Sequence, residues 1–186
     1  EKTFFLKKIG YTFYLKYFIV KNKNETMLDF TPLSWTKDFY PDDHRYMNFM
    51  KKVFRHEFRK NGFRRISTSV LEKSEIIDEV FGAEHDSIYR TQDGCLRAHS
   101  AVWILRAYLQ SEMNEQIQPV YFYYMGNYFS NTETGYNEMH KIWGEIIGEN
   151  DPILDAILMY VTYSVFKKIG LWDKFTLRIN SVGVEN

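Results

Sequence analysis

The segment "YYMGNYFSNTETGYNEMHKIWGEIIG", from Tyr123 to Gly148, predicts the centre of the fold. Two stretches rich in aromatic and β-branched residues, Val120–Phe129 and Glu138–Ile147, flank the polar loop "SNTETGYN". Strands joined by so short a loop must be antiparallel. We therefore expect a long β-hairpin from Val120 to Ile147.

Alternation along the second strand of this hairpin separates two sets of side chains. One set is mostly apolar and should face a core under helices: His140, Ile142, Gly144 and Ile146. Lys141, Trp143 and Glu145 share the other face, which we expect to be the open face of the sheet. They could cover a solvated surface with a Lys–Glu pair. They could also line a pocket for a zwitterion, with Glu145 binding an amine and Lys141 a carboxylate.

Three longer helices are predicted around the hairpin. Pro41-Asp42 opens the first, which Asn61-Gly62 ends. Asp151 caps another helix, with Pro152 at its first position and Gly170 at its end. Between them, Ser100 is expected to cap a helix whose buried stripe is Val102, Leu105, Leu109 and Met113, with Trp103 and Tyr108 beside it.

Shorter elements complete the pattern. A short strand is predicted in "FRRIST", followed by a helical turn in "SVLEKSEIIDEVFG". A small hairpin is predicted in Tyr89–Leu96, and a final strand in "KFTLRIN". The alternation of helices and antiparallel strands predicts an α+β domain with the helices on one face of the sheet.

The composition supports a folded domain and excludes several classes of protein. The hydrophobic fraction is 45% and the aromatic fraction 18%, so a sizeable core is expected. Lys plus Arg and Asp plus Glu both number 24, unlike a protein whose whole surface coats nucleic acid. The single Cys95 excludes an internal disulfide, suits a reducing compartment, and is expected to be a small buried residue. No apolar run is long enough for a membrane span, and no ligand spacing supports a metal site.

Residues 1–27 are expected to form a basic, aromatic N-terminal extension to a domain of residues 28–186. The stretch from Lys2 to Asn24 contains six lysines and no acid. Lys16 interrupts the apolar run that a signal peptide needs, and the stretch lacks the arginine that a mitochondrial presequence prefers. A basic arm that contacts RNA or a partner chain is one interpretation, and an aromatic strand or helix on the core is the other.

Six segments resemble, in order, parts of the catalytic domain of histidyl-tRNA synthetase, a class II aminoacyl-tRNA synthetase. The resemblance runs from Thr31 to Gly183. Of the six segments given next, the second corresponds to motif 1 of the family, and the fourth and fifth correspond to the two strands of its motif 2. The segments are "WTKDFYPDD", "FRKNGFRRISTSVLEKSEI", "YRTQDGCLRAHSA", "QPVYFYYMGNYF", "EMHKIWGEIIGENDPILDAILM" and "LRINSVG".

The resemblance implies a class II synthetase-like antiparallel sheet flanked by helices. It also implies the family reaction, which activates histidine with ATP and magnesium and transfers it to tRNA. A homodimer that forms through motif 1 is implied as well, although Ser69 stands in place of that motif's proline. The amino-acid-binding residues that it suggests are Glu145, Lys141, Arg97 and His99.

Departures from the family pattern fall on the residues that would handle ATP. The motif 2 arginine follows Gly-Pro-x-Phe in the family, and "GNYFS" puts Ser130 in its position. The loop after it is shorter and replaces the family's arginines and Pro-Gln with Asn131, Thr132, Glu133 and Thr134. Losing one arginine from a phosphate in a transition state costs on the order of 10³-fold in rate. No catalytic residue is therefore assigned.

Other departures fall on the residues that would bind histidine. Arg97–Ala101 replaces the family's Arg-Pro-Glu-Gly-Thr, so that His99 stands for the glutamate and Ala101 for the threonine. A histidine-binding glutamine is replaced by Lys141, whereas Glu145 is retained. The sequence ends at Asn186, before the position of motif 3 and of the anticodon domain.

Two interpretations follow from this mixture of matches and departures. The first is an intracellular histidyl-tRNA synthetase-like protein, cytoplasmic or organellar, whose catalysis is impaired in this chain. The alternative is a pseudo-synthetase that acts as a histidine-sensing regulatory subunit or as a structural subunit of a larger assembly. The sequence alone does not decide whether the chain is an enzyme.

Overall fold

The computed structural model describes residues 4–8, 11–15, 31–82, 87–131 and 137–178. The chain divides into two compact units, which are Glu1–Thr31 and Pro32–Asn186. In the first unit, β1 (Phe4–Lys8) pairs antiparallel with β2 (Tyr11–Leu15). The division into an extension of residues 1–27 and a domain of residues 28–186 stays a prediction.

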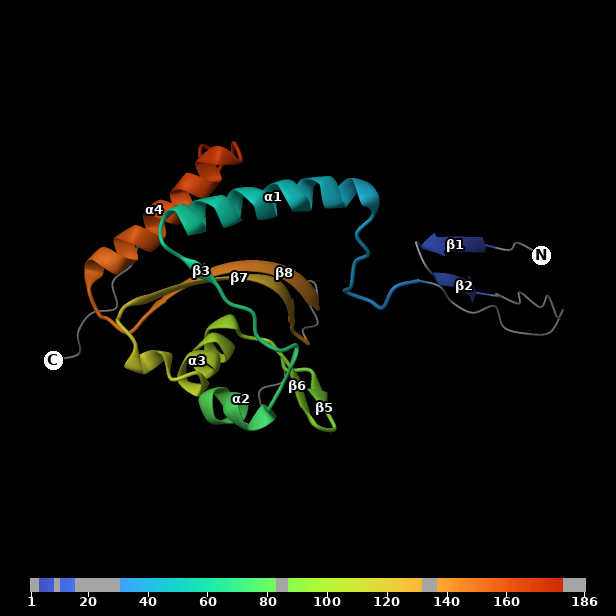
Figure 1. Ribbon diagram of the computed structural model, residues 1–186, viewed down its shortest axis with the longest axis horizontal. Coiled ribbons are helices and arrows are strands. Elements are labelled where there is room, and N and C mark those ends of the chain that lie inside the picture. Colours follow the sequence, from blue (N-terminus) through green and yellow to red (C-terminus); the bar gives the residue numbers. More distant parts are fainter. Residues whose placement is uncertain (1–3, 9–10, 16–30, 83–86, 132–136, 179–186) are drawn as a thin grey trace. The chain divides into compact units, whose positions relative to one another are not determined.

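The second unit is built on a sheet with the strand order β3-β7-β8 (Figure 1). The predicted hairpin is confirmed, with β7 at Val120–Phe129 and β8 at Glu138–Ile147. The two strands pair antiparallel along their whole length. The strand predicted in "FRRIST" is only β3 (Arg64–Arg65), which joins β7 in parallel.

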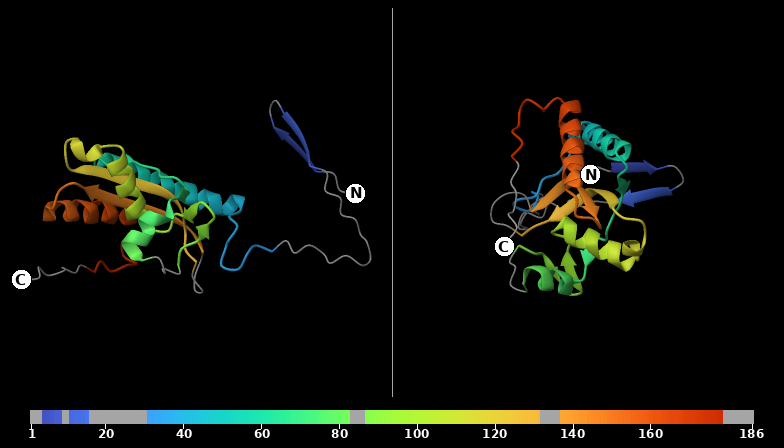
Figure 2. Two further views of the ribbon diagram at one scale, coloured as in Figure 1. Left: turned by 90° about the horizontal axis from the view of Figure 1, so that it is seen from below. Right: turned by 90° about the vertical axis from the view of Figure 1, so that its left-hand side faces the viewer.

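Helices cover both faces of this sheet (Figures 1 and 2). On one side lie α1 (Pro41–Lys60) and α4 (Pro152–Lys168), and on the other α2 (Ser74–Phe81) and α3 (Ser100–Gln110). An α+β fold with an antiparallel hairpin flanked by helices is confirmed, but the expectation of helices on one face is wrong. The physical reason is that β7 carries large apolar or aromatic side chains at nearly every position, so both of its faces need cover.

The core on the α1 side explains why β8 carries a glycine. Phe58 of α1 packs against Tyr123 and Phe63, and Val161 of α4 joins the same cluster. A Cβ at Gly144 would lie 2.5 Å from Phe58 Cε1 and 2.9 Å from Leu158 Cδ1. The missing side chain therefore lets both helices approach β8 closely.

An ion pair between a buried carboxylate and a partly exposed lysine ties the two helices of this side together. Glu57 of α1 is 2% exposed and accepts a hydrogen bond from Lys168 near the end of α4. At the start of α4, Asp151 caps the helix as predicted, with its Oδ1 accepting from the Ile153 N–H at 2.9 Å.

On the other side, the predicted buried stripe of α3 is confirmed only in part, because Val102 and Met113 pack against buried clusters and Leu105 and Leu109 do not. Trp103 and Ile104 are fully buried, whereas Leu105 is 46% and Leu109 is 53% exposed. The helix begins at Ser100 with His99 in the N-cap position, one residue before the predicted cap. Because α3 is apolar on nearly its whole circumference, its periodicity alone could not identify the buried side.

A second small sheet, ordered β4-β6-β5, is attached to α3. The predicted hairpin is confirmed as β5 (Arg90–Thr91) and β6 (Gly94–Leu96), and β6 also pairs with β4 (Leu71–Glu72), which was not predicted. Glu72 Oε1 accepts from Arg106 of α3 at 2.8 Å. Cys95 is buried here, as expected, and burial raises the pKa of its thiol, which disfavours the reactive thiolate form.

The end of the described domain differs from the prediction. A short 3-10 helix, η1 (Met113–Glu115), connects α3 to β7. Residues 174–178 contain no strand, so this part of the predicted final strand is wrong, while residues 179–186 lie outside the described part. Among the residues that the structure describes, no helix has both the length and the apolar character to cross a membrane.

Candidate functional site

The face of the β7–β8 hairpin that points toward α3 carries the side chains that the sequence singled out. Glu145 lies opposite Phe122, Trp143 opposite Tyr124, and Lys141 opposite Gly126. The expected alternation is therefore correct, but the face is only partly open. Aromatic side chains of β7 pack under Ile104 and Tyr108 of α3, whereas Trp143 on β8 remains 44% exposed.

Gly126 allows Tyr124 to lie along the sheet. A Cβ at Gly126 would be 2.3 Å from Tyr124 Oη, so the phenol crosses the space that any other residue would fill. Burial raises the pKa of Tyr124, while the charge of Arg97 and a hydrogen bond with Tyr128 act in the opposite direction. Tyr124 is therefore a neutral hydroxyl in the floor of the site at physiological pH.

Arg97 fixes the positions of Tyr124 and Tyr128 through contacts with their rings and with nearby backbone carbonyls. Its Nε donates to the Asn127 carbonyl at 2.7 Å, and its Nη1 donates to the Thr68 carbonyl at 2.8 Å. The guanidinium carbon lies 5.1 Å from the ring centroid of Tyr124 and 5.6 Å from that of Tyr128. With Arg97 only 7% exposed, its charge is committed to the protein's own carbonyls and rings.

Lys141 and Glu145 do not form the pair that either sequence interpretation considered. Lys141 Nζ lies 5.7 Å from the Tyr128 ring centroid, and Tyr128 stands opposite Met139, on the far side of Lys141 from Glu145. Glu145 is half-buried beside Trp143. Burial raises the pKa of its carboxyl, and a hydrogen bond from the Trp143 side chain lowers it to a smaller extent. The candidate residues thus lie in two separate places. Glu145 is paired with Trp143, whereas Arg97 and Lys141 both contact the ring of Tyr128.

The other two candidates lie at the margins of this face. The His99 ring stacks on Phe81 of α2, with centroids 4.4 Å apart. Ser130 follows β7 directly, and its N–H donates to the Asn137 carbonyl at 2.9 Å. The loop residues 132–136 lie outside the described part of the chain.

Sequence reasoning missed Tyr124, Gly126 and Tyr128 as members of the site. They alternate along β7 and so share the face of the predicted β8 residues. This alternation was a usable signal, but the aromatic residues at neighbouring positions of β7 obscured it. Their contacts with Arg97 depend on residues from a distant segment, which no local pattern indicates.

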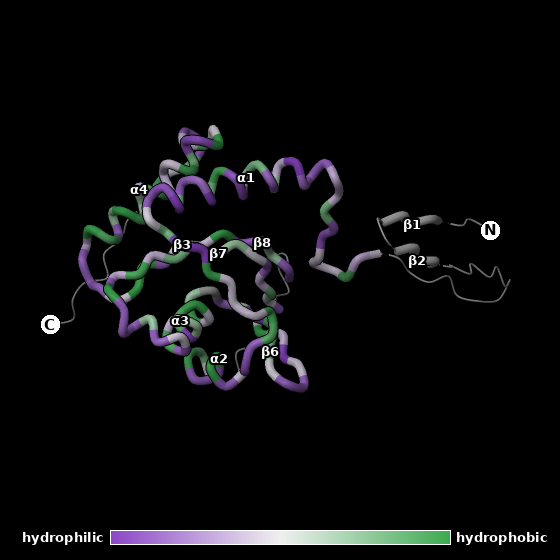
Figure 3. Tube along the Cα trace, in the orientation of Figure 1, coloured by the Kyte–Doolittle hydropathy of each residue, from purple (hydrophilic) through white to green (hydrophobic). Residues whose placement is uncertain are grey.

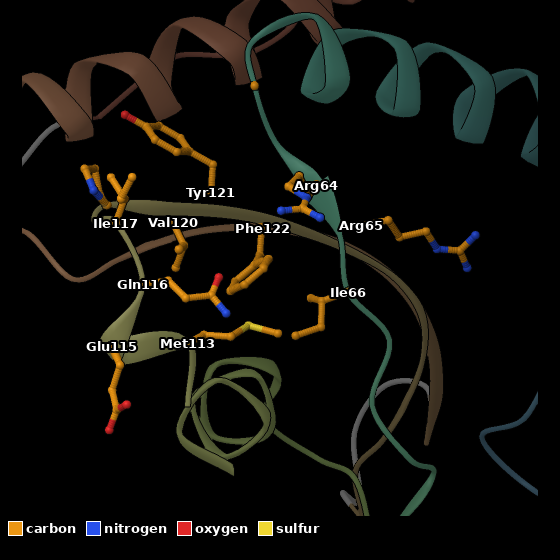
Figure 4. A pocket seen from close by; sticks show the side chains of 12 residues that line it. Arg64, Arg65, Ile66, Met113, Glu115, Gln116, Ile117, Val120, Tyr121 and Phe122 are labelled. Carbon is orange, nitrogen blue, oxygen red and sulfur yellow. The ribbon is translucent and has the colours of Figure 1, made fainter. Parts of the chain in front are cut away.

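A hollow of about 830 Å³ adjoins this face at the start of β7 (Figure 4). Phe122 forms part of both, because it lies opposite Glu145 and also lines the hollow. Figure 4 shows Ile66, Met113 and Gln116 pointing into the same space from the segment after β3 and from η1. The hollow is therefore mainly apolar on the side next to Phe122.

Comparisons with known proteins agree with this architecture. The chain is 29% identical over 165 residues to a histidine–tRNA ligase of Pelobacter propionicus, covering 82% of this chain and 40% of the relative. It is 27% identical over 164 residues to the same enzyme of Orientia tsutsugamushi, with shares of 82% and 39%. The chain thus spans about two fifths of the length of these curated relatives. No sequence model of a known protein family matches it.

Solved structures show the same fold. A Bacillus halodurans protein described as an ATP phosphoribosyltransferase regulatory subunit/histidyl-tRNA synthetase superposes with a TM-score of 0.70 at 19% identity, covering 78% of this chain and 40% of that one. The histidyl-tRNA synthetase of S. aureus gives 0.66 at 20% identity, with shares of 76% and 35%. The fold and its central hairpin are those of a class II aminoacyl-tRNA synthetase-like domain. More specifically, the chain carries a histidyl-tRNA synthetase-like catalytic domain.

The contacts of Arg97 predict a large stabilising role. Arg97→Met should lower the free energy of unfolding by about 2–4 kcal/mol, because the partly buried carbonyls of residues 68 and 127 lose a charged donor. Urea denaturation followed by circular dichroism measures this loss. The control is Arg45→Met, since Arg45 is exposed and pairs only with exposed Asp42. Equal stability of the two variants would contradict the role assigned to Arg97.

Burial of Glu145 predicts a specific dependence of stability on pH. When folding raises the pKa of a carboxyl, the folded protein becomes less stable as the pH rises from the carboxyl's ordinary pKa to the raised value. Glu145→Gln should therefore unfold at a higher temperature than the unaltered chain at pH 7, and this advantage should disappear below about pH 4. Thermal unfolding across that range tests the prediction, with the exposed Glu149→Gln as the matched control. An advantage that persists unchanged in acid would exclude this cause.

Proposed function

We propose that this domain is a histidyl-tRNA synthetase-like module that is impaired in the ATP-dependent activation of histidine. The observation that carries the proposal is the end of β7, where the resemblance places Ser130 in the position of a phosphate-binding arginine. Stabilising the charge that develops on a transferred phosphate requires a fixed cation, and a hydroxyl supplies none.

The two cations of the candidate site are both engaged elsewhere. Arg97 is adjacent, since the Phe129 N–H donates to its carbonyl at 3.1 Å, but its guanidinium is bound to carbonyls and tyrosine rings. Lys141 is directed at Tyr128. The loop from Asn131 to Tyr136 contributes a glutamate and no basic residue.

The residues present therefore do not fit ATP. The family's enzymes use ATP with magnesium, and a triphosphate at the end of β7 would meet the hydroxyl of Ser130 where it needs positive charge. Among the described residues, no group of three or more His, Cys, Asp and Glu side chains could hold a metal ion. We assign no catalytic step to this chain.

Glu145 favours the alternative, a pseudo-synthetase that senses histidine or serves as a structural subunit. A half-buried carboxylate beside an indole can bind an ammonium group, which would also offset its burial. The B. halodurans neighbour, whose description includes a regulatory subunit, shares the fold. A regulatory role needs amino-acid binding without the phosphate chemistry, and these residues could support that.

Partners are also proposed from the family and from the surface. A homodimer through α1 and β3 would cover Tyr46 and Phe49, which are 71% and 51% exposed. The tRNA is a partner if activation occurs. The basic segment from Lys2 to Lys23 is proposed to contact RNA or a partner subunit, and removing it should then release that partner.

The assignment of Ser130 predicts a gain of function. Ser130→Arg should bind ATP at least about tenfold more tightly than the unaltered chain, because it restores a cation next to the phosphates. Isothermal titration with Mg·ATP measures the affinity, and Ser130→Gln controls for side-chain length without charge. Tight binding of ATP by the unaltered chain, or ATP–pyrophosphate exchange with histidine, would contradict the proposed impairment.

Titration with histidine separates the sensing role from the structural one. The unaltered chain should bind histidine at neutral pH, and Glu145→Gln should weaken binding about tenfold or more, because the amine loses its charged acceptor. Histidinol, which keeps the amine but lacks the carboxylate, tests whether Lys141 contributes. If histidine does not bind to the unaltered chain, the sensing role is wrong and the structural role is favoured.

A further inference from the structure

Among the strands that the structure describes, β8 has a neighbour on one edge only. In the order β3-β7-β8 it is the last strand, and it pairs with β7 along all ten of its residues (Figure 1). It carries apolar residues over much of its length, whereas α1 is predominantly hydrophilic (Figure 3). Native proteins usually cover or interrupt such an edge, and β8 contains no proline that would do so.

The hydrogen bonds of β7 identify the backbone groups that lie along this edge. The Phe129 N–H donates to the Arg97 carbonyl and the Tyr123 carbonyl accepts from the Ile66 N–H, so the odd-numbered residues of β7 point away from β8. Because hydrogen bonds alternate along an antiparallel pair, the odd-numbered residues of β8 are the ones that bond to β7. The even-numbered residues therefore direct their N–H and C=O groups outward: His140, Ile142, Gly144 and Ile146. Within the described part of the chain, no backbone hydrogen bond reaches these outward groups.

The side chains of β8 are complementary to those of an antiparallel copy of the same strand. Lys141 and Glu145 share a face, two positions to either side of Trp143. If Trp143 of one copy lies opposite Trp143 of the other, each Lys141 lies opposite a Glu145. Centring the match on residue 142 or 144 would set a charged side chain opposite the indole, and centring it on 141 or 145 would set like charges opposite each other. The register centred on Trp143 therefore pairs both charges and the aromatic rings at once.

The same register also suits the backbone. It sets Ile142 opposite Gly144 of the second copy, and since both have outward N–H and C=O groups, they can exchange two hydrogen bonds. Lys141, Trp143 and Glu145 then fall in the non-hydrogen-bonded pairs, in which opposite side chains come closest. Directly opposite residues share a face, so the two copies would form one continuous sheet with matching faces.

We propose that β8 pairs antiparallel with β8 of a second copy of this chain, about a two-fold axis at Trp143. The two indoles meet at the axis and cover a side chain that is 44% exposed in the single copy. The ammonium group of each Lys141 meets the half-buried carboxylate of Glu145 in the other copy. Lys141 Nζ lies 5.7 Å from the Tyr128 ring centroid in the single copy, and its flexible stem allows it to turn to the second copy.

This contact is different from the homodimer proposed through α1 and β3. Because β3 lies at the opposite edge of the sheet, the two contacts can form together and would then join copies into a ring or an open chain. The inference does not rest on the proposed function, since it requires neither histidine nor ATP. Glu145 serves in both, so bound histidine would compete with the second copy.

Reversal of the two charges tests the contact and its register. The parent for these measurements is the full chain with Tyr46→Ser and Phe49→Ser, which removes two exposed side chains of the contact proposed through α1. In this parent, Lys141→Glu or Glu145→Lys should each weaken association about tenfold or more, because two opposite-charge pairs become like-charge pairs. The double variant, Lys141→Glu with Glu145→Lys, should regain most of the affinity. Sedimentation velocity over a range of concentrations measures the dissociation constant.

Two comparisons separate this effect from misfolding and from net charge. An equimolar mixture of the two single variants should associate, because each new charge faces its opposite in the mixed pair. Lys174→Glu should leave association unchanged, since it alters the net charge as much as Lys141→Glu does but at an exposed position outside β8. A parent whose dissociation constant exceeds about 1 mM, or a double variant as weak as the single ones, would overturn the proposal.

A disulfide at the axis tests the register directly. In the parent chain, Trp143→Cys should form a disulfide-linked dimer with oxidised glutathione, because the two Cα atoms of a non-hydrogen-bonded pair are about 4.5 Å apart. Met139→Cys is the matched control on the same face, since its counterpart in the second copy would lie about 27 Å away along the strand. Cys95 is buried and is common to both variants. No dimer at residue 143, or equal yields for the two variants, would contradict the register.

Hydrogen exchange of backbone amides distinguishes a second copy from other occupants of this edge. The amides of Ile142 and Gly144 should exchange about tenfold or more slowly above the dissociation constant than below it, because pairing protects them from water. Protection that is independent of concentration, in a chain that sediments as a monomer, would assign the edge to a segment of the same chain and overturn the proposal. Protection that appears only when a different protein is added would overturn it as well.

Discussion

The antiparallel pairing of β7 with β8 is the constraint on which the rest of the domain depends. It fixes which side chains of each strand face α1 and α4 and which face α3. A shift of one residue would exchange the two faces of a strand, so that Tyr123 and Met125 would leave their core and Phe122 and Tyr124 would leave theirs. Both helical layers and both groups of candidate site residues follow from this single register.

The sequence predicted the elements that depend on local patterns. The ends of β7 and β8, the limits of α1 and the cap of α4 could be derived from alternation, from Asn61-Gly62 and from Asp151-Pro152. The two-residue strands β3 and β4 could not be predicted well, because pairing with a distant strand defines them and periodicity does not. The buried side of α3 was predicted only in part because apolar residues surround that helix, and tertiary contacts decide that Trp103 and Ile104 are buried while Leu105 and Leu109 are not.

The candidate site shows the same division between local and long-range information. Alternation correctly placed Lys141, Trp143 and Glu145 on one face, but it could not show that Lys141 is directed toward Tyr128 or that Glu145 lies beside the indole. Arg97 illustrates the difficulty most clearly. The resemblance suggests that it binds a ligand, yet in the fold it joins β7 to the segment after β3, a role that depends on residues 68 and 127 together.

The difference between the two partners of β7 has a consequence for the order of folding. β8 follows β7 after one short loop, so closing that loop costs little chain entropy and the hairpin can form early. β3 pairs with the same strand in parallel, but α2, the small sheet and α3 all lie between them in the chain. The hairpin should therefore act as a template that is complete before β3 docks, and docking of β3 then places the end of α1 against the sheet.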